Sequence, residues 1–213
     1  MPRLRKPPSL IGPTKILVRR EMAVVLADLT RKAARSPNTR LNLIIFRLAA
    51  CCGLRASEIA SLRIGDVRVE VARPHLAIRM GKGGRARAVP LWWDAGTLED
   101  IAAWKMARSE QTTVADQDFF AGSLRPGRVG TELSRHTLRK RFRTACKVLG
   151  AARLETLTIH HGRHTFLSHA LAGGRTLAEV RDAAGHANIS VTSGYLHAAV
   201  DDEAPVGNLF RFS

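Results

Sequence analysis

The sequence has few cysteines, few aromatic residues and no long apolar run. Its three cysteines, Cys51, Cys52 and Cys146, sit among apolar residues, and none belongs to a CxxC pair. This excludes a disulfide framework and a cysteine-rich zinc site, and it indicates reduced, buried thiols. No stretch reaches the length of a membrane span, and residues 1–15 lack the apolar core of a signal peptide. We therefore expect a cytoplasmic protein with no membrane partner.

Acidic residues are scarce beside basic ones. The 213 residues contain 34 Lys and Arg against 18 Asp and Glu, which gives a formal net charge of +16. Only seven of these cations are lysine, and the guanidinium group of arginine binds phosphate bidentately. Such an excess attracts polyanions, so double-stranded DNA is the expected partner. The alternative is an arginine-rich, solvated surface with no such role.

The hydrophobic pattern predicts one compact, mainly helical domain with a small antiparallel sheet. Strands are expected at 75–80 and 85–89, joined by a tight turn at Gly81-Lys82-Gly83-Gly84. Ser36-Pro37-Asn38 separates the first two helices, and we expect Asn38 or Thr39 to cap the second. Helices are expected at 20–35, 39–52, 57–62, 94–109, 134–149, 160–172, 176–184 and 189–200.

Four short segments combine residue types suited to phosphate chemistry. They are Cys52-Gly-Leu-Arg55-Ala-Ser-Glu58-Ile, Gly81-Lys82-Gly-Gly, His160-His-Gly-Arg163-His-Thr-Phe, and Gly185-His186 followed nine residues later by Tyr195-Leu-His197. In this order and at these separations they resemble the tyrosine recombinases of the phage integrase family. The resemblance extends over nearly the whole chain, from about Ile16 to His197.

The resemblance implies the catalytic fold of the DNA breaking and rejoining enzymes at residues 16–200. It implies a site-specific recombinase that cuts DNA, forms a 3′-phosphotyrosine intermediate and reseals the strands through a four-way junction. No cofactor or metal is needed, because the phosphotyrosine link preserves the bond energy. The expected assembly is a homotetramer on paired DNA sites. Integration, excision, inversion and resolution all remain open as outcomes.

Two arginines are expected to hold the phosphate. Attack on a phosphodiester builds negative charge on the phosphoryl oxygens, which cationic groups stabilise. Arg55 and Arg163 match the family positions for this role. The alternative for Arg55 is an internal ion pair with Glu58, one helical turn away, and we expect Glu58 to support Arg55 in either case.

Tyr195 is the only tyrosine and matches the family nucleophile. A phenol with an ordinary pKa near ~10 needs nearby cations to react at neutral pH. The alternative is a tyrosine that only packs. Lys82, in the expected turn, matches the general acid that protonates the leaving 5′-oxygen, although turn lysines are common. The glycines around it lack the spacing of a nucleotide-binding P-loop.

The histidines complete the expected site. The resemblance implies that His160 hydrogen-bonds the phosphate and helps to take the tyrosine proton, and that His186 is a third phosphate contact. His164 is expected to orient Arg163 or to pack. The clustered histidines His160, His161, His164 and His169 raise the question of a metal site. No acidic residue lies near them in sequence and there is no HExxH, so we expect none.

A basic stripe runs along the helix expected at 134–149. Its members recur at i,i+4 spacing and are Arg135, Arg139, Arg143 and Lys147. The stripe either lies along a DNA phosphate backbone or is an ordinary solvated helix face.

The chain also departs from the family. Gly162 stands where leucine is usual, which is expected to loosen a core contact. We expect residues 1–15 to form a basic, weakly ordered arm and not a DNA-clamping domain, and an accessory protein or a neighbouring protomer is then expected to supply the clamp. The tail at 201–213 carries the large apolar residues Val206, Leu209, Phe210 and Phe212. We expect it to dock on an adjacent protomer or to fold back on its own domain.

Two other functions remain open. A DNA-binding regulator with this fold would have no use for Tyr195 or Lys82. A type IB topoisomerase uses a similar site but relaxes any supercoiled plasmid, whereas a recombinase needs a specific sequence.

Overall fold

The computed structural model describes residues 13–79, 86–110, 115–196 and Phe210. The α-helices are α1 (Arg19–Ala33), α2 (Pro37–Phe46), α3 (Ala56–Ser61), α4 (Ala95–Ser109), α5 (Arg135–Ala145), α6 (Ala151–Thr156), α7 (Ile159–Ala172), α8 (Leu177–Ala184) and α9 (Ile189–Ser193). Short 3-10 turns lie at Pro13–Lys15, Ile64–Asp66, Ala115–Gln117 and Cys146–Leu149, and a π-helical turn lies at Arg47–Cys51. The strands are β1 (Val67–Arg68), β2 (His75–Ile78) and β3 (Arg87–Pro90).

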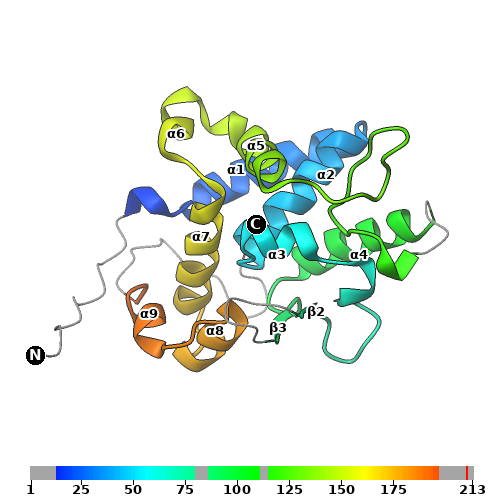
Figure 1. Cartoon of the computed structure of the whole chain (residues 1–213). Coiled ribbons are helices and arrows are strands. Elements are labelled where there is room, and N and C mark those ends of the chain that lie inside the picture. Colours follow the sequence, from blue (N-terminus) through cyan, green and yellow to red (C-terminus); the bar gives the residue numbers. More distant parts are fainter. Residues whose placement is uncertain (1–12, 80–85, 111–114, 197–209, 211–213) are drawn as a thin grey trace, which may run out of the picture.

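The most apolar segment forms the centre of the molecule. Helix α2 and the π-helical turn that continues it contact α1, α4, α5 and α7, which surround them (Figure 1). Nearly every side chain from Leu41 to Cys52 is buried, as the unbroken apolar pattern predicts. The expected mainly helical class is therefore confirmed.

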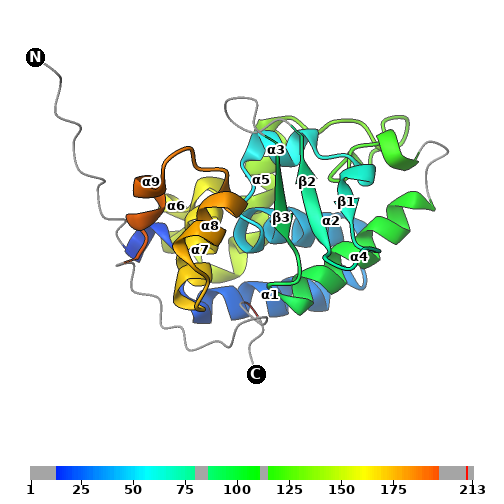
Figure 2. The same ribbon diagram turned by 90° about the horizontal axis from the view of Figure 1, so that it is seen from below.

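The sheet is small and antiparallel, in the order β1-β2-β3. Leu76 pairs with Val67 on one side and with Val89 on the other, and all three side chains are buried. The sheet lies at one side of the helical core, with β3 next to α8 (Figure 2). The turn expected at 81–84, including Lys82, lies outside the described residues.

The structure corrects several expected boundaries. Ser36 caps α2 by accepting a hydrogen bond from the Thr39 amide, with Pro37 at the first helical position. The prediction that Asn38 or Thr39 is the cap is therefore wrong. The helix expected at 189–200 ends at Ser193 and passes into a turn at Gly194. Strand β1 and helix α6 were not expected, because each is too short to show a periodic pattern.

Gly162 brings α7 close to the π-helical turn. A Cβ atom at this position would lie 3.0 Å from the carbonyl carbon of Ala49 and 3.1 Å from its Cβ. The structure therefore shows the opposite of a loosened contact: the missing side chain allows a closer approach than leucine would.

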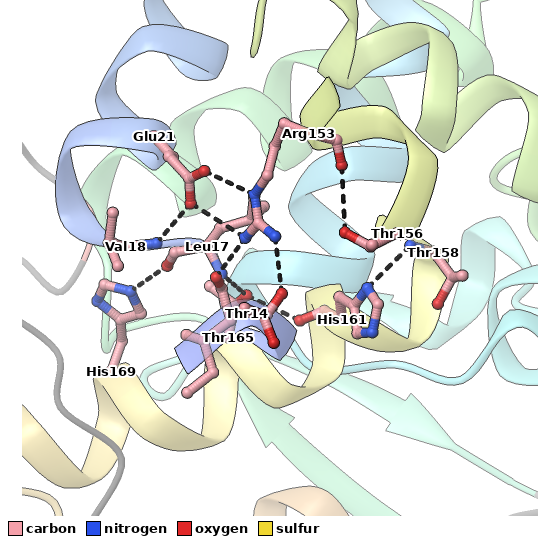
Figure 3. A network of polar contacts seen from close by, with 11 residues as sticks. Thr14, Leu17, Val18, Glu21, Arg153, Thr156, Thr158, His161, Thr165 and His169 are labelled. Atoms are coloured by element: carbon pink, nitrogen blue, oxygen red, sulfur yellow. Dashed lines mark hydrogen bonds and ion pairs between the residues drawn. The ribbon is translucent and has the colours of Figure 1, made fainter. Parts of the chain in front are cut away.

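The segment before α1 is held against α6 and α7 (Figure 3). Arg153 of α6 donates hydrogen bonds to Glu21 and to the carbonyl oxygens of Thr14 and Ile16. The Leu17 amide donates to Thr165 Oγ1 of α7 at 2.9 Å. The chain entering the domain is thus attached to the helix that carries Arg163.

A buried ion network joins the π-helical turn to α4 and to Phe210. Arg47 contacts Asp94 at 3.3 Å and Asp100 at 2.8 Å. The Phe210 amide donates to Asp94, and the Phe210 ring lies 5.4 Å from the His169 ring, between centroids. Phe210 thus packs on its own domain; the rest of the tail lies outside the described residues. No helix within the described ranges is long and apolar enough to cross a membrane.

Candidate active site

Arg55 stands at the end of a tight turn. Gly53 has φ +66°, and a Cβ there would lie 2.3 Å from the Phe166 ring, so this turn requires glycine. Arg55 is the N-cap residue of α3, and its amide donates to Glu58 Oε2 at 2.8 Å. The turn after the central helix therefore directs Arg55 away from the core, with its side chain 23% exposed.

Glu58 organises two arginines. Its carboxylate accepts a hydrogen bond from the Arg55 guanidinium at 2.8 Å and two more from Arg87 of β3, also at 2.8 Å. Arg87 donates a further hydrogen bond to the Ala183 carbonyl at the end of α8. Burial alone would raise the pKa of Glu58, but the hydrogen bonds and charges of Arg87 and Arg55 outweigh it and lower this pKa to about 2.

Arg163 is fixed between two backbone carbonyl groups. Its guanidinium donates to Gly53 O at 2.6 Å and to Ala184 O at 2.5 Å, and only 7% of the residue is exposed. Burial, helped by the charge of Arg55, lowers the pKa of Arg163 to about 10. Arg163 therefore keeps its charge at neutral pH, and its orientation is set by the backbone on both sides of the site.

Tyr195 lies just after α9, with its ring between two histidines. Its hydroxyl is 2.6 Å from Nδ1 of His164, and the ring of His186 stacks on it with centroids 6.5 Å apart. His186 Nδ1 is in turn 2.9 Å from Thr192 Oγ1. The tyrosine is 6% exposed, so the nucleophile expected from the sequence is nearly buried in this conformation.

Burial and positive charge set the ionisation of this group. Burial raises the pKa of Tyr195 to about 12, although the Arg163 charge acts in the opposite direction. Burial also lowers the pKa of His164 and of His186 to about 4, and neighbouring cations add to the effect. At neutral pH the site therefore holds a neutral phenol, two neutral imidazoles and charged arginines.

The remaining sequence-predicted residues that the structure describes are exposed. His160 is exposed at the start of α7 and borders a hollow of about 660 Å³ that Arg139, Arg143 and His136 of α5 also line. Arg135, Arg139, Arg143 and Lys147 are all exposed. Lys82 and His197 fall outside the described residues. Within the described ranges, no three His, Cys, Asp or Glu side chains are grouped to hold a metal ion.

Sequence reasoning missed Arg87 and the contact that His164 makes. Arg87 lies in strand β3, where the residue pattern does not mark it as a functional residue. Only the fold brings it to Glu58. His164 was expected to orient Arg163 or to pack, whereas its ring contacts Tyr195. No local signal in the sequence pointed to Arg87; its role follows from the burial of Glu58 in the structure, since a buried carboxylate requires cationic or hydrogen-bonding partners.

Comparison with known proteins finds the same family by profile and by individual relatives. A sequence profile of the phage integrase family matches residues 22–201. The tyrosine recombinase XerA of Thermococcus onnurineus is 30% identical over 202 residues, which cover 93% of this chain and 64% of that protein. XerC of Chromobacterium violaceum is 36% identical over 151 residues, or 71% of this chain and 46% of that protein.

Solved structures share the fold. The crystal structure of XerA recombinase has a TM-score of 0.68 at 21% identity, covering 85% of this chain and 60% of that one. XerH recombinase bound to its difH substrate in a pre-cleavage complex has a TM-score of 0.69 at 24% identity, covering 89% of this chain and 52% of that one. The chain spans less than two thirds of the length of each of these relatives.

Proposed function

The chain belongs to the phage integrase family, and from this premise we propose that it is a site-specific recombinase that cuts and rejoins DNA through a 3′-phosphotyrosine at Tyr195. The observation that carries the proposal is that the charge of Arg163 acts on the Tyr195 phenol, while Arg55 and Arg87, from two further segments, lie in the same cluster as Arg163. Glu58 offsets one of the charges of Arg55, Arg87 and Arg163, so the cluster keeps a net positive charge for an anion.

The arrangement supports a division of roles. Arg55, which is partly exposed, and Arg163, which is held rigidly, would bind the non-bridging oxygens of the scissile phosphate and stabilise the charge that develops there. His186, beside Tyr195, would contact the same phosphate, and His160 would approach it from the α5 side. Lys82 would protonate the leaving 5′-oxygen. Arg87 would act through Glu58 by fixing Arg55.

The exposed stripe of α5 supports binding to duplex DNA. We assign Arg135, Arg139, Arg143 and Lys147 to phosphate contacts, because all four are exposed and two of them, Arg139 and Arg143, line the hollow that His160 also borders. Two of the structural relatives, XerH and a lambda integrase dimer on a core site, are bound to DNA. A homotetramer on paired sites, acting in the cytoplasm, completes the proposal.

The test is a covalent protein–DNA adduct seen on a denaturing gel. Nicked duplexes drawn from the DNA that flanks this gene are incubated with wild type, Tyr195→Phe and Arg163→Ala. Wild type should form an adduct. Tyr195→Phe should bind DNA but form none, because the phenol oxygen is gone, and Arg163→Ala should lose the adduct and part of the binding.

Other results would favour the rival functions. Adduct formation by Tyr195→Phe would refute the assignment of the nucleophile. Binding by both proteins without any adduct would indicate a DNA-binding regulator, and relaxation of any supercoiled plasmid would indicate a type IB topoisomerase.

A further inference from the structure

The hydroxyl of Tyr195 is paired with a histidine to which the family resemblance gives no catalytic role. The oxygen lies 2.6 Å from His164 Nδ1, and the two ring centroids are 5.6 Å apart. His164 lies on α7 next to Arg163, so the helix that places the arginine on the phosphate also places this imidazole on the nucleophile. A contact of this length between a phenol and a ring nitrogen is a strong hydrogen bond.

The surroundings of His164 keep its imidazole neutral. It is partly buried, and its cationic or titratable neighbours are His161 and His160 on its own helix, Lys15 before α1, Arg163, and His186 across the tyrosine ring. Burial first, and then these neighbours, lower the pKa of His164 to about 4. A neutral imidazole that carries its proton on Nε2 accepts the hydrogen bond at Nδ1 and leaves the phenol as the donor, and this tautomer is part of the proposal.

We propose that His164 is the group that holds the Tyr195 hydroxyl and accepts its proton as the phenol attacks DNA. The inference rests on the proposed recombinase function. It differs from the resemblance, which gives proton acceptance to His160. His160 is exposed and borders the hollow under α5, where it is placed to contact phosphate, whereas His164 touches the reacting oxygen.

The proposed step balances in protons and electrons. A lone pair of the Tyr195 oxygen forms the new O–P bond, the bond from phosphorus to the 5′-oxygen breaks, and that oxygen takes a proton from Lys82. The phenol proton passes to His164 Nδ1 and leaves an imidazolium, which the bound phosphate stabilises. The transfer accompanies attack, because the phenol oxygen loses basicity as its bond to phosphorus forms. Resealing runs the same transfers in reverse.

The experiment separates removal of the Tyr195 proton from donation of a proton to the leaving 5′-oxygen. The substrate is a nicked duplex in which sulfur replaces the bridging 5′-oxygen at the scissile phosphate, since a thiolate leaves without being protonated. Single-turnover adduct formation is measured between pH 6 and 9 with saturating protein. The chains are wild type, Tyr195→Phe, Lys82→Ala, His160→Gln, His164→Gln and His164→Asn. Asparagine keeps an acceptor atom near the position of Nδ1 but cannot take a proton.

The variants are expected to differ both in the rate of adduct formation at pH 7 and in how that rate depends on pH. Wild type and Lys82→Ala should react on the sulfur substrate at similar rates that change little with pH. Both His164 variants should react about 10²-fold or more slowly at pH 7, and their rates should rise about tenfold per pH unit, because the phenol must now ionise first. His160→Gln should be slower but keep the flat profile, since only its phosphate contact is removed.

Three outcomes would overturn the inference. If His164→Asn reacted at the wild-type rate, His164 would only hold the hydroxyl and would not accept its proton. If the rates of both His164 variants did not change with pH, His164 would take no part in proton transfer. A steep profile in His160→Gln, with flat profiles in the His164 variants, would return the role to His160. Failure of the proposed function looks different, because wild type itself would then form no adduct on either substrate.

Discussion

Replacing Glu58 with glutamine should lower the free energy of unfolding by about 3 kcal/mol at pH 7. The folded protein holds the pKa of this carboxyl at about 2, against an ordinary value of 4.5, because Arg87 and Arg55 outweigh the effect of burial. Each pKa unit corresponds to ~1.4 kcal/mol, so the ionised carboxylate contributes about 3 kcal/mol above pH 5. Glutamine also leaves the buried Arg87 without a counter-charge, which acts in the same direction.

The pH dependence gives the prediction its sign. A carboxyl whose pKa is lowered by folding contributes stability above its unfolded pKa, and that contribution is lost as the pH falls towards the folded pKa. The contribution of Glu58 should shrink to about 1 kcal/mol at pH 3. The stability difference between wild type and Glu58→Gln should therefore narrow by about 2 kcal/mol between pH 7 and pH 3.

Urea unfolding provides the measurement, followed by the fluorescence of the buried Trp93 and Trp104. Glu155→Gln is the matched control, because Glu155 is exposed on α6, and it should match wild type within about 0.5 kcal/mol. A Glu58→Gln protein as stable as wild type, or a difference that stays constant down to pH 3, would refute the account of Glu58 as the ionised centre of the arginine cluster.

Two further predictions concern the turn and the basic stripe. Gly53→Ala should destabilise the protein by more than about 2 kcal/mol in thermal unfolding, because its Cβ would meet Phe166. Gly127→Ala, at φ +73° with open space around it, should cost only about 1 kcal/mol, and equal effects of the two substitutions would contradict the steric argument. Arg139→Gln combined with Arg143→Gln should reduce the slope of log K against log salt for DNA binding by about 0.9 for each phosphate that the protein no longer neutralises. An unchanged slope, as expected for the Arg31→Gln control on α1, would remove the stripe from the interface.

The sequence was sufficient for the fold class and for most of the helices, because their apolar periodicity is local. The central helix could be placed from its apolar residues, and the order of the motifs was enough to indicate the family. What could not be predicted were features with no local pattern. The π-helical turn at Arg47–Cys51 has the same composition as the helix before it, and a two-residue strand such as β1 has no period.

The organisation of the candidate site depended on contacts between distant segments. Arg87 of β3 reaches Glu58 of α3 only through the fold, and nothing in the residues around Arg87 indicates that partner. His164 lies on α7 and Tyr195 in the turn after α9, so only the packing of these two segments decides which histidine faces the phenol. The motifs therefore indicated which residues gather, while the hydrogen bonds among them came from the fold.

The close contact at Gly162 makes one position without a functional group important for catalysis. Any side chain there would push α7 away from the backbone of Ala49 by some tenths of an ångström. Arg163 is the next residue, and its guanidinium spans two carbonyl groups that do not belong to α7, so it cannot follow the helix without lengthening those bonds. His164 would move with it. The tolerance of the protein to mutation should thus be lowest at this glycine, and a methyl group at residue 162 should misalign the proposed nucleophile and the proposed phosphate-binding arginine together.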